Sequence, residues 1–120
     1  MNMKINTTFD NSINSFVVRM PKEITFEALT LWEEVFLELL SKEEKCKNIT
    51  CLVDTNKHKF ESITSLKLLR DILSKIEMQY GFVSLAFVQP EAYRKPSIVS
   101  SKEGYFICFK DAYEWLEEKN

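Results

Sequence analysis

Residues 49–76 constrain the fold most, because they predict a buried strand, a polar loop and an amphipathic helix in direct succession. Ile49–Val53 is apolar except for Thr50, which is typical of a strand that is covered on both faces. After a loop at 54–61, a predicted helix begins near Ser62 and carries its apolar side chains at helical spacing over 62–76. The Tyr80-Gly81 pair is predicted to end this helix. A strand followed by a helix needs a crossover to reach the next strand, so this stretch predicts a parallel sheet.

Shorter patterns of the same kinds extend over the rest of the chain. Residues 3–9 alternate apolar and polar side chains, and turn-forming residues at 10–12 lead into a second strand, which predicts an antiparallel hairpin. The Thr25 hydroxyl can accept a bond from the first turn of a long helix, as an N-cap does. In chain order, the predicted elements are strands at 3–9 and 14–20, a helix at 26–45, a strand at 49–53, a helix at 62–76, a strand at 82–88, a short helix at 91–95, a strand at 105–109 and a last helix capped by Asp111.

This order of elements predicts the α/β fold class. We expect a mixed, mostly parallel sheet of about five strands that starts with a β-hairpin and is covered by three to four helices. The chain has 120 residues, 45% of them hydrophobic, which is enough for one domain over 1–120 with a full core. Ala28, Leu31 and Val35 widen the apolar stripe of the first helix, and both core packing and a homo-oligomer would account for that width.

Composition excludes several classes of function. The net charge of −2 disfavours nucleic acid as a partner, because phosphate contacts need a concentrated cationic surface. The N-terminal residues contain no apolar signal region, and no apolar run approaches the roughly 20 residues of a transmembrane segment. The three cysteines show no paired spacing, so we expect reduced thiols and a cytoplasmic location.

Catalytic and metal-binding residues are sparse. His58 is the only histidine, which excludes sites built from several histidines. Cys51 and Cys108 are predicted to lie in buried strands away from it, so a nucleophile–base pair is not expected. The sequence therefore predicts no catalytic residues, no metal site and no cofactor.

Three stretches together resemble a known family. They are the hairpin and helix FVVRMPKEITFEALTLWEEVFLELL, the strand, loop and helix CLVDTNKHKFESITSLKLLRDIL, and the ending YFICFKDAYEWLEE. In this pattern the chain resembles the STAS domains of anti-sigma-factor antagonists, and more closely the small bacterial SpoIIAA-like proteins, which share their fold with CRAL-TRIO lipid-binding domains. The resemblance covers nearly the whole chain and rests on apolar patterns.

The resemblance also points to one residue for a regulatory switch. In phosphorylated STAS antagonists, a partner kinase modifies a serine that follows an aspartate at the start of this helix. The matching pair here is Glu61-Ser62, and Ile63 and Thr64 stand where the family has a second serine and a glycine. Ser62 is therefore the candidate phosphorylation site, and its alternative role is that of an ordinary N-cap.

Two further groups are candidates for binding. Lys57, His58 and Lys59 form a small basic patch at the C-terminal end of a predicted strand, the edge at which open α/β sheets bind ligands. This patch could dock an anion or a partner, and its alternative is a solvated loop. Tyr93 and Arg94 lie in the 89–103 segment, which the resemblance to lipid-binding folds makes a candidate lid over an apolar ligand.

The expected function is that of a regulatory or protein-binding module that is not an enzyme and lacks the full phosphoserine motif of the STAS antagonists. The partner would be another protein. The alternative is a binder of a small apolar or lipid-like ligand beneath the 89–103 segment.

Overall fold

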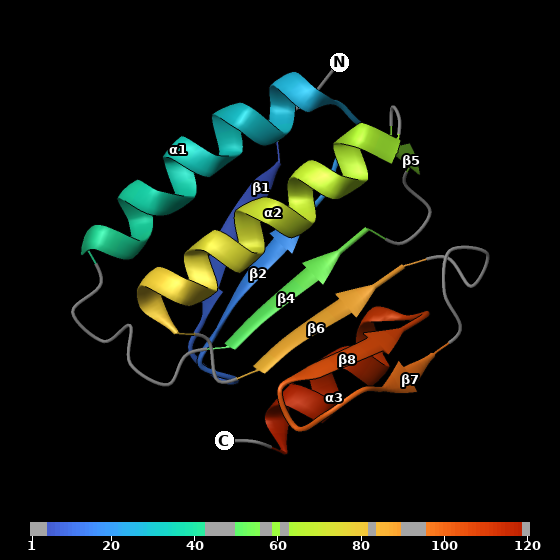
Figure 1. Ribbon diagram of the computed structural model, residues 1–120. Helices are drawn as coiled ribbons and strands as arrows, with labels where there is room; N and C mark the ends of the chain where they lie inside the picture. Colours follow the sequence, from blue (N-terminus) through green and yellow to red (C-terminus); the bar gives the residue numbers. More distant parts are fainter. Residues whose placement is uncertain are drawn as a thin grey trace.

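The computed structural model describes residues 5–42, 50–55, 59–60, 63–81, 84–89 and 96–118. A central sheet separates two layers of helix. Helices α1 (Phe26–Lys42) and α2 (Ile63–Tyr80) lie side by side on one face, and α3 (Phe109–Glu117) lies on the other face (Figure 1). The strands are β1 (Asn6–Asp10), β2 (Ser15–Arg19), β3 (Glu23–Ile24), β4 (Thr50–Asp54), β5 (Lys59–Phe60), β6 (Ser84–Val88), β7 (Ser97–Ile98) and β8 (Glu103–Phe106).

The main sheet has six strands in the order β1-β2-β4-β6-β8-β7. Its four central strands are parallel, while β1 and β7 pair antiparallel at the two edges. This confirms the mixed, mostly parallel sheet with a hairpin at its start. The sequence did not predict β7, or β3 and β5, which pair in a separate two-stranded sheet. Each of these strands has two residues, too few to show any periodicity.

Alternation along the strands divides the core into two clusters. Phe16, Val18, Cys51 and Val53 point toward α1 and α2, whose apolar stripes pack on them. The intervening residues of the same strands point toward α3, where Ala112 and Leu116 are fully buried. Because both faces are covered, the strands are apolar on both sides, as the sequence of residues 49–53 predicts.

Local signals fix the ends of the first two helices. The Thr25 hydroxyl accepts a hydrogen bond from the Ala28 backbone N–H at 3.1 Å, which confirms the predicted N-cap of α1. Gly81 follows the last residue of α2 with φ +73, a left-handed conformation that favours glycine, and its N–H donates to the Glu77 carbonyl at 2.8 Å.

The prediction for the last strand and helix is wrong in detail. Strand β8 ends at Phe106, and α3 begins at Phe109 with Cys108 in the N-cap position, where its side chain makes no capping bond. Asp111 is not the cap but lies in the first turn, where its carboxylate is favoured by the helix dipole. The apolar residues 105–109 have strand-like character, but the last three are partly or well exposed and turn the chain into the helix. The predicted helix at 91–95 lies outside the described residues.

Candidate functional site

The binding residues predicted from the sequence follow two neighbouring strands. The backbone N–H and the hydroxyl of Thr55, just after β4, both donate to the Val88 carbonyl of β6, at 2.7 and 2.8 Å. Thr55 and Gln89, which directly follow β4 and β6, therefore lie at the same edge of the sheet. Lys57, His58, Ser62, Tyr93 and Arg94 lie outside the described residues, and of Lys59 only the backbone in β5 is described.

A small cavity lies at this edge, beneath α2. Gln89 is 7% exposed, and its Nε2 has no hydrogen-bond partner among the described residues. The cavity has a volume of about 10 Å³ and is lined by Thr55, Leu66, Leu69, Arg70, Phe87 and Gln89. That volume holds about one water molecule, which would satisfy the amide.

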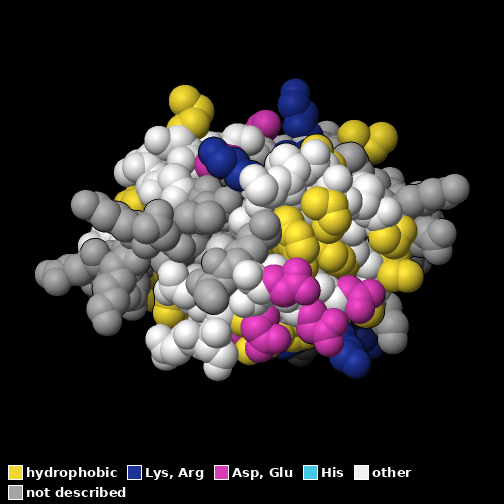
Figure 2. All heavy atoms as spheres, turned by 90° about the horizontal axis from the view of Figure 1, so that it is seen from below, with side chains coloured by type: hydrophobic (Ala, Val, Ile, Leu, Met, Phe, Trp, Pro, Cys, Tyr) yellow, Lys and Arg dark blue, Asp and Glu magenta, His cyan; other side chains and the backbone are white. Residues whose placement is uncertain are grey.

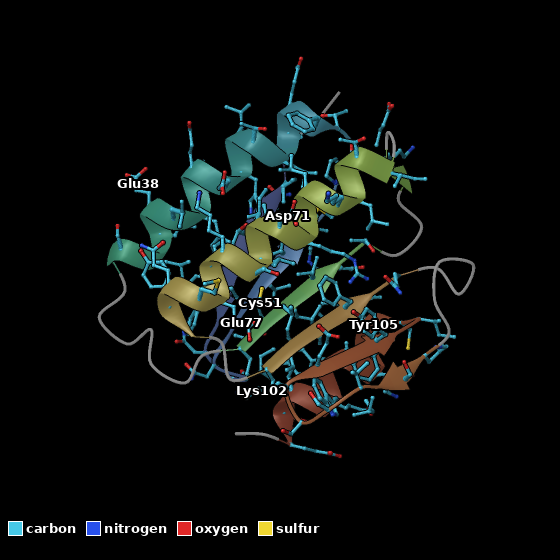
Figure 3. The ribbon with its side chains drawn as sticks, in the orientation of Figure 1. Glu38, Cys51, Asp71, Glu77, Lys102 and Tyr105 are labelled. Carbon is cyan, nitrogen blue, oxygen red and sulfur yellow. The ribbon has the colours of Figure 1, made fainter. Side chains whose placement is uncertain are left out.

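A second cavity of about 60 Å³ lies between α2 and the strands β6 and β8. Arg70 and Glu77 of α2 line it together with Glu103 of β8. The Tyr105 hydroxyl, on the same strand, donates to Glu103 Oε2 at 3.1 Å. Tyr105 and Glu77 are labelled in Figure 3. Burial raises the pKa of Tyr105 above its ordinary value, and the charge of Arg70 partly opposes this. A volume of this size also suits water and not a lipid chain.

The Cys51 thiol is poorly suited to attack a substrate. Cys51 is fully buried, and burial raises the pKa of its thiol well above the ordinary value, so the thiolate is disfavoured. Asp54, at the end of β4, accepts a hydrogen bond from Arg19 at 3.4 Å, and the Arg19 guanidinium lies 4.5 Å from the centre of the Phe109 ring. Among these residues there is no cluster of three or more metal-binding side chains.

An apolar strip lies on α1, formed by Ala28, Leu31, Val35 and Leu39, and is here called the α1 stripe. Leu31 is 65% exposed and Val35 is 54% exposed, although both are large apolar residues. A groove of about 570 Å³ runs beside the stripe and is lined by Ile5, Thr25, Glu27, Ala28, Leu31, Trp32 and Val35. The sequence showed the extra width of this stripe but not what it faces.

The α1 stripe overhangs the edge of the described sheet that β1 forms. Trp32 Nε1 of α1 donates to the Thr7 hydroxyl of β1 at 2.8 Å, and the Phe36 ring packs against Phe16 of β2 at 5.2 Å. Helix α1 therefore covers β1 and β2, the two outermost strands on this side. The stripe lies on the side of α1 away from α2, which α1 meets through the ion pair of Glu33 with Lys75 at 3.3 Å.

Backbone bonds of β2 show which groups of β1 face outward. Thr50 N–H donates to the Asn14 carbonyl, and Met20 N–H donates to the Asp54 carbonyl, so the even-numbered residues of β2 bond toward β4. The odd-numbered residues then bond toward β1, where they pair with Asn6, Thr8 and Asp10. The backbone groups of Thr7 and Phe9 consequently point away from β2, along the open edge.

Helix α3 carries a different surface. Its exposed acidic side chains gather beside hydrophobic ones on the face seen from below (Figure 2). These acidic residues are Asp111, Glu114, Glu117 and Glu118. The shallow hollow along this helix includes Lys110 and two of the carboxylates, Glu114 and Glu117. Among the described helices, none has the length and apolar character needed to cross a bilayer.

Comparisons with known proteins agree with this architecture. No protein-family model matches the chain, and no curated protein sequence matches it. One solved structure, an uncharacterised protein of the DUF3478 family from Shewanella loihica PV-4 that is described as having a SpoIIAA-like fold, aligns with a TM-score of 0.58 at 14% identity. The alignment covers 93% of this chain and 91% of that chain. At this identity the likeness concerns the fold, and it confirms the prediction from the sequence: this chain has a SpoIIAA-like α/β fold.

Proposed function

We propose that this protein is a non-enzymatic binding module that receives a protein partner on the edge formed by β1 and the α1 stripe. The observation that carries the proposal is the exposure of Leu31 and Val35 beside an edge of the sheet at which β1 pairs with no further strand of the described residues. Exposed apolar side chains scattered singly are common, but a continuous strip beside a groove marks an interaction surface. The SpoIIAA-like fold supports a binding role and leaves the partner open.

The edge offers two kinds of contact at once. The outward backbone groups of Thr7 and Phe9 can pair with a strand from a partner, which gives affinity independent of side chains. The groove between Ile5 and the α1 stripe can take apolar side chains of that partner, which gives selectivity.

A small apolar ligand is less well supported. The cavities lined by described residues near β6 and β8 measure about 10 and 60 Å³. Ligand pockets usually have volumes of about 300 Å³ or more. The groove beside the α1 stripe reaches that size, but it is open along the surface and borders a strand edge, which suits a polypeptide better.

Site-specific photocrosslinking in living cells tests the proposal. A photoreactive phenylalanine analogue at position 31 should give one or a few discrete crosslinked products. The same analogue in place of Met78, which is 89% exposed on α2, is the matched control and should give none of them. Equal crosslinking at both positions, or no product at position 31, would contradict a docking role for this edge.

Regulation through Ser62 is a further part of the proposal. Helix α2 begins at Ile63, so the serine directly precedes it in the chain. A phosphate at such a place would be favoured by the unpaired N–H groups of the first helical turn. Phosphopeptide mapping of protein isolated from its own host checks this part, and a Ser62 peptide that is never found modified under any growth condition argues against it.

A further inference from the structure

We infer that the occupant of this edge is a second copy of the same chain. The two copies would form a two-fold dimer in which β1 pairs antiparallel with β1 of the other copy and the two α1 stripes pack together. This inference rests on the proposed function, because it names the partner of the same surface.

The first observation is the difference between the two edges of the sheet. Strand β7 has only two residues, which leaves little backbone for pairing. Strand β1 pairs with β2 over five consecutive residues without a bulge, and it contains no lysine or proline. Short strands, bulges, proline and charged side chains, lysine above all, are the usual means of blocking a free edge. The one charged residue of β1, Asp10, is its last residue, so among the described residues the outward backbone groups of Thr7 and Phe9 lack this protection.

The second observation is that self-pairing of β1 places the helices correctly. Two copies of one strand that pair antiparallel are related by a two-fold axis normal to the sheet, so both α1 helices lie on the same face. Strands are spaced by about 4.8 Å and packed helices by about 8–10 Å, so each helix covers about two strands. Because α1 covers β1 and β2 through Thr7 and Phe16, the next helix position is over the β1 and β2 of the second copy.

The chemistry of α1 matches that position. The side chains that would meet the second helix are Ala28, Leu31, Val35 and Leu39, spaced by three or four residues and free of charge. The neighbouring carboxylates Glu27, Glu34 and Glu38 are exposed, and each lies about 100° around the helix from the stripe residue that follows it. They therefore border the stripe on its solvent side, in the way that charged residues border an apolar helix seam.

The size of the surface sets the expected strength of the dimer. Helix α1 has 17 residues, a length of about 26 Å, and the helix and sheet layers together are about 20 Å deep. The contact is then of order 500 Å² on each copy, which is at the lower end of specific interfaces. We expect a reversible dimer with a dissociation constant in the micromolar range.

Sedimentation velocity over about 1 to 200 µM protein, a range chosen to bracket micromolar affinity, tests the inference. The wild-type chain should shift from monomer to dimer. Leu31→Glu would bury a charge against the second stripe and should raise the dissociation constant at least about tenfold. Met78→Glu adds the same charge to an exposed residue of α2 and should change it by less than about twofold.

A second pair of variants tests the strand. Thr7→Pro removes an outward N–H, which an edge strand tolerates without losing a bond to β2, and should abolish dimerisation. Both Thr7→Pro and Thr7→Val lose the hydroxyl that accepts the Trp32 hydrogen bond. Because Thr7→Val keeps the outward N–H, it should retain the dimer. Thermal unfolding verifies that each variant is folded.

The outcomes separate this inference from the function on which it rests. A monomer at every concentration, or a dimer that Leu31→Glu and Thr7→Pro leave unchanged, overturns self-pairing. If the chain is monomeric and position 31 still crosslinks to a different protein, only the identity of the partner is wrong. If position 31 gives no crosslink at all, the proposed docking edge fails as well.

Discussion

At the scale of single residues, close packing limits what β8 can tolerate. Gly104 lies beneath the Phe106 ring and the Ile98 side chain, and a Cβ atom built there would be 2.9 Å from Phe106 Cε2 and 3.2 Å from Ile98 Cδ1. The Phe106 ring also packs against Trp115 of α3, with ring centres 5.5 Å apart, so it has limited freedom to move away.

We predict that Gly104→Ala lowers the free energy of unfolding by about 1–2 kcal/mol, because the added methyl group displaces a packed ring. Urea unfolding followed by circular dichroism measures the change. Gly104→Ala combined with Phe106→Leu serves as the control, since the shorter side chain removes the crowding and should recover part of the loss. Full stability in Gly104→Ala alone would contradict the packing described for this strand.

Burial of the Tyr105 phenol predicts a dependence of stability on alkaline pH. Its pKa is raised in the folded state, so the folded protein holds the proton at pH values where the unfolded chain releases it. The stabilisation is complete below about pH 10, the ordinary pKa of tyrosine, and is lost as the pH rises toward the folded-state pKa.

Chemical unfolding at a series of pH values from 8 to about 11, which spans the ordinary tyrosine pKa, measures this effect. Burial also raises the pKa of Cys51, so the informative quantity is the difference in the free energy of unfolding between the wild type and Tyr105→Phe. The free energy of unfolding of the wild type, relative to that of Tyr105→Phe, should fall above about pH 10. A difference that does not vary with pH would argue against a buried phenol.

At the scale of elements, the described helix ends differ in what stabilises them. Thr25 caps α1 through its hydroxyl, and Gly81 ends α2 in a left-handed conformation. Cys108 occupies the N-cap of α3 without a side-chain bond, so α3 depends more on packing of Ala112 and Leu116 than on capping.

Thr25→Ala is predicted to lower the free energy of unfolding by about 1 kcal/mol, because the Ala28 N–H loses its partner. Thr25→Ser keeps an oxygen at the same place and should stay within a few tenths of a kcal/mol of the wild type. Thermal and urea unfolding of the two variants provide the measurement. Equal losses in both would mean that the methyl group, and not the hydroxyl, stabilises this end of α1.

At the scale of the whole molecule, the strand order determines which surfaces remain for partners. Helices α1 and α2 cover the same face of the sheet, and α1 lies above the outermost pair of strands, β1 and β2 (Figure 1). An apolar stripe that would be ordinary core on a central helix is therefore exposed at the edge. The same arrangement makes β1 the longer free strand of the sheet.

Self-pairing across this edge predicts an unusual response to salt. The two-fold axis normal to the sheet places Glu27, Glu34 and Glu38 of both copies on the same side of the contact, where they repel. Sodium chloride screens this repulsion, since the Debye length falls from about 10 Å at 0.1 M to about 3 Å at 1 M. Sedimentation velocity should therefore show a tighter dimer at high salt, whereas a basic partner on the same edge would bind less tightly there.

Features that depend on local periodicity and backbone chemistry can be predicted from the amino-acid sequence. The hairpin, the buried strand that precedes α2, the Thr25 cap and the glycine at the end of α2 follow from patterns a few residues long. These patterns are enough to predict the mixed, mostly parallel sheet, because an apolar strand followed by an amphipathic helix forces a crossover.

Which apolar residues are covered depends on how the helices and strands pack together. Leu29 and Leu31 are equally apolar, yet Leu29 is fully buried and Leu31 is largely exposed. The difference arises because α1 has a neighbouring helix on one side and, among the described residues, open surface on the other. Strand order is set by contacts between residues distant along the chain, and no local pattern encodes it. The α1 stripe, and with it the proposed docking edge, therefore became recognisable only in three dimensions.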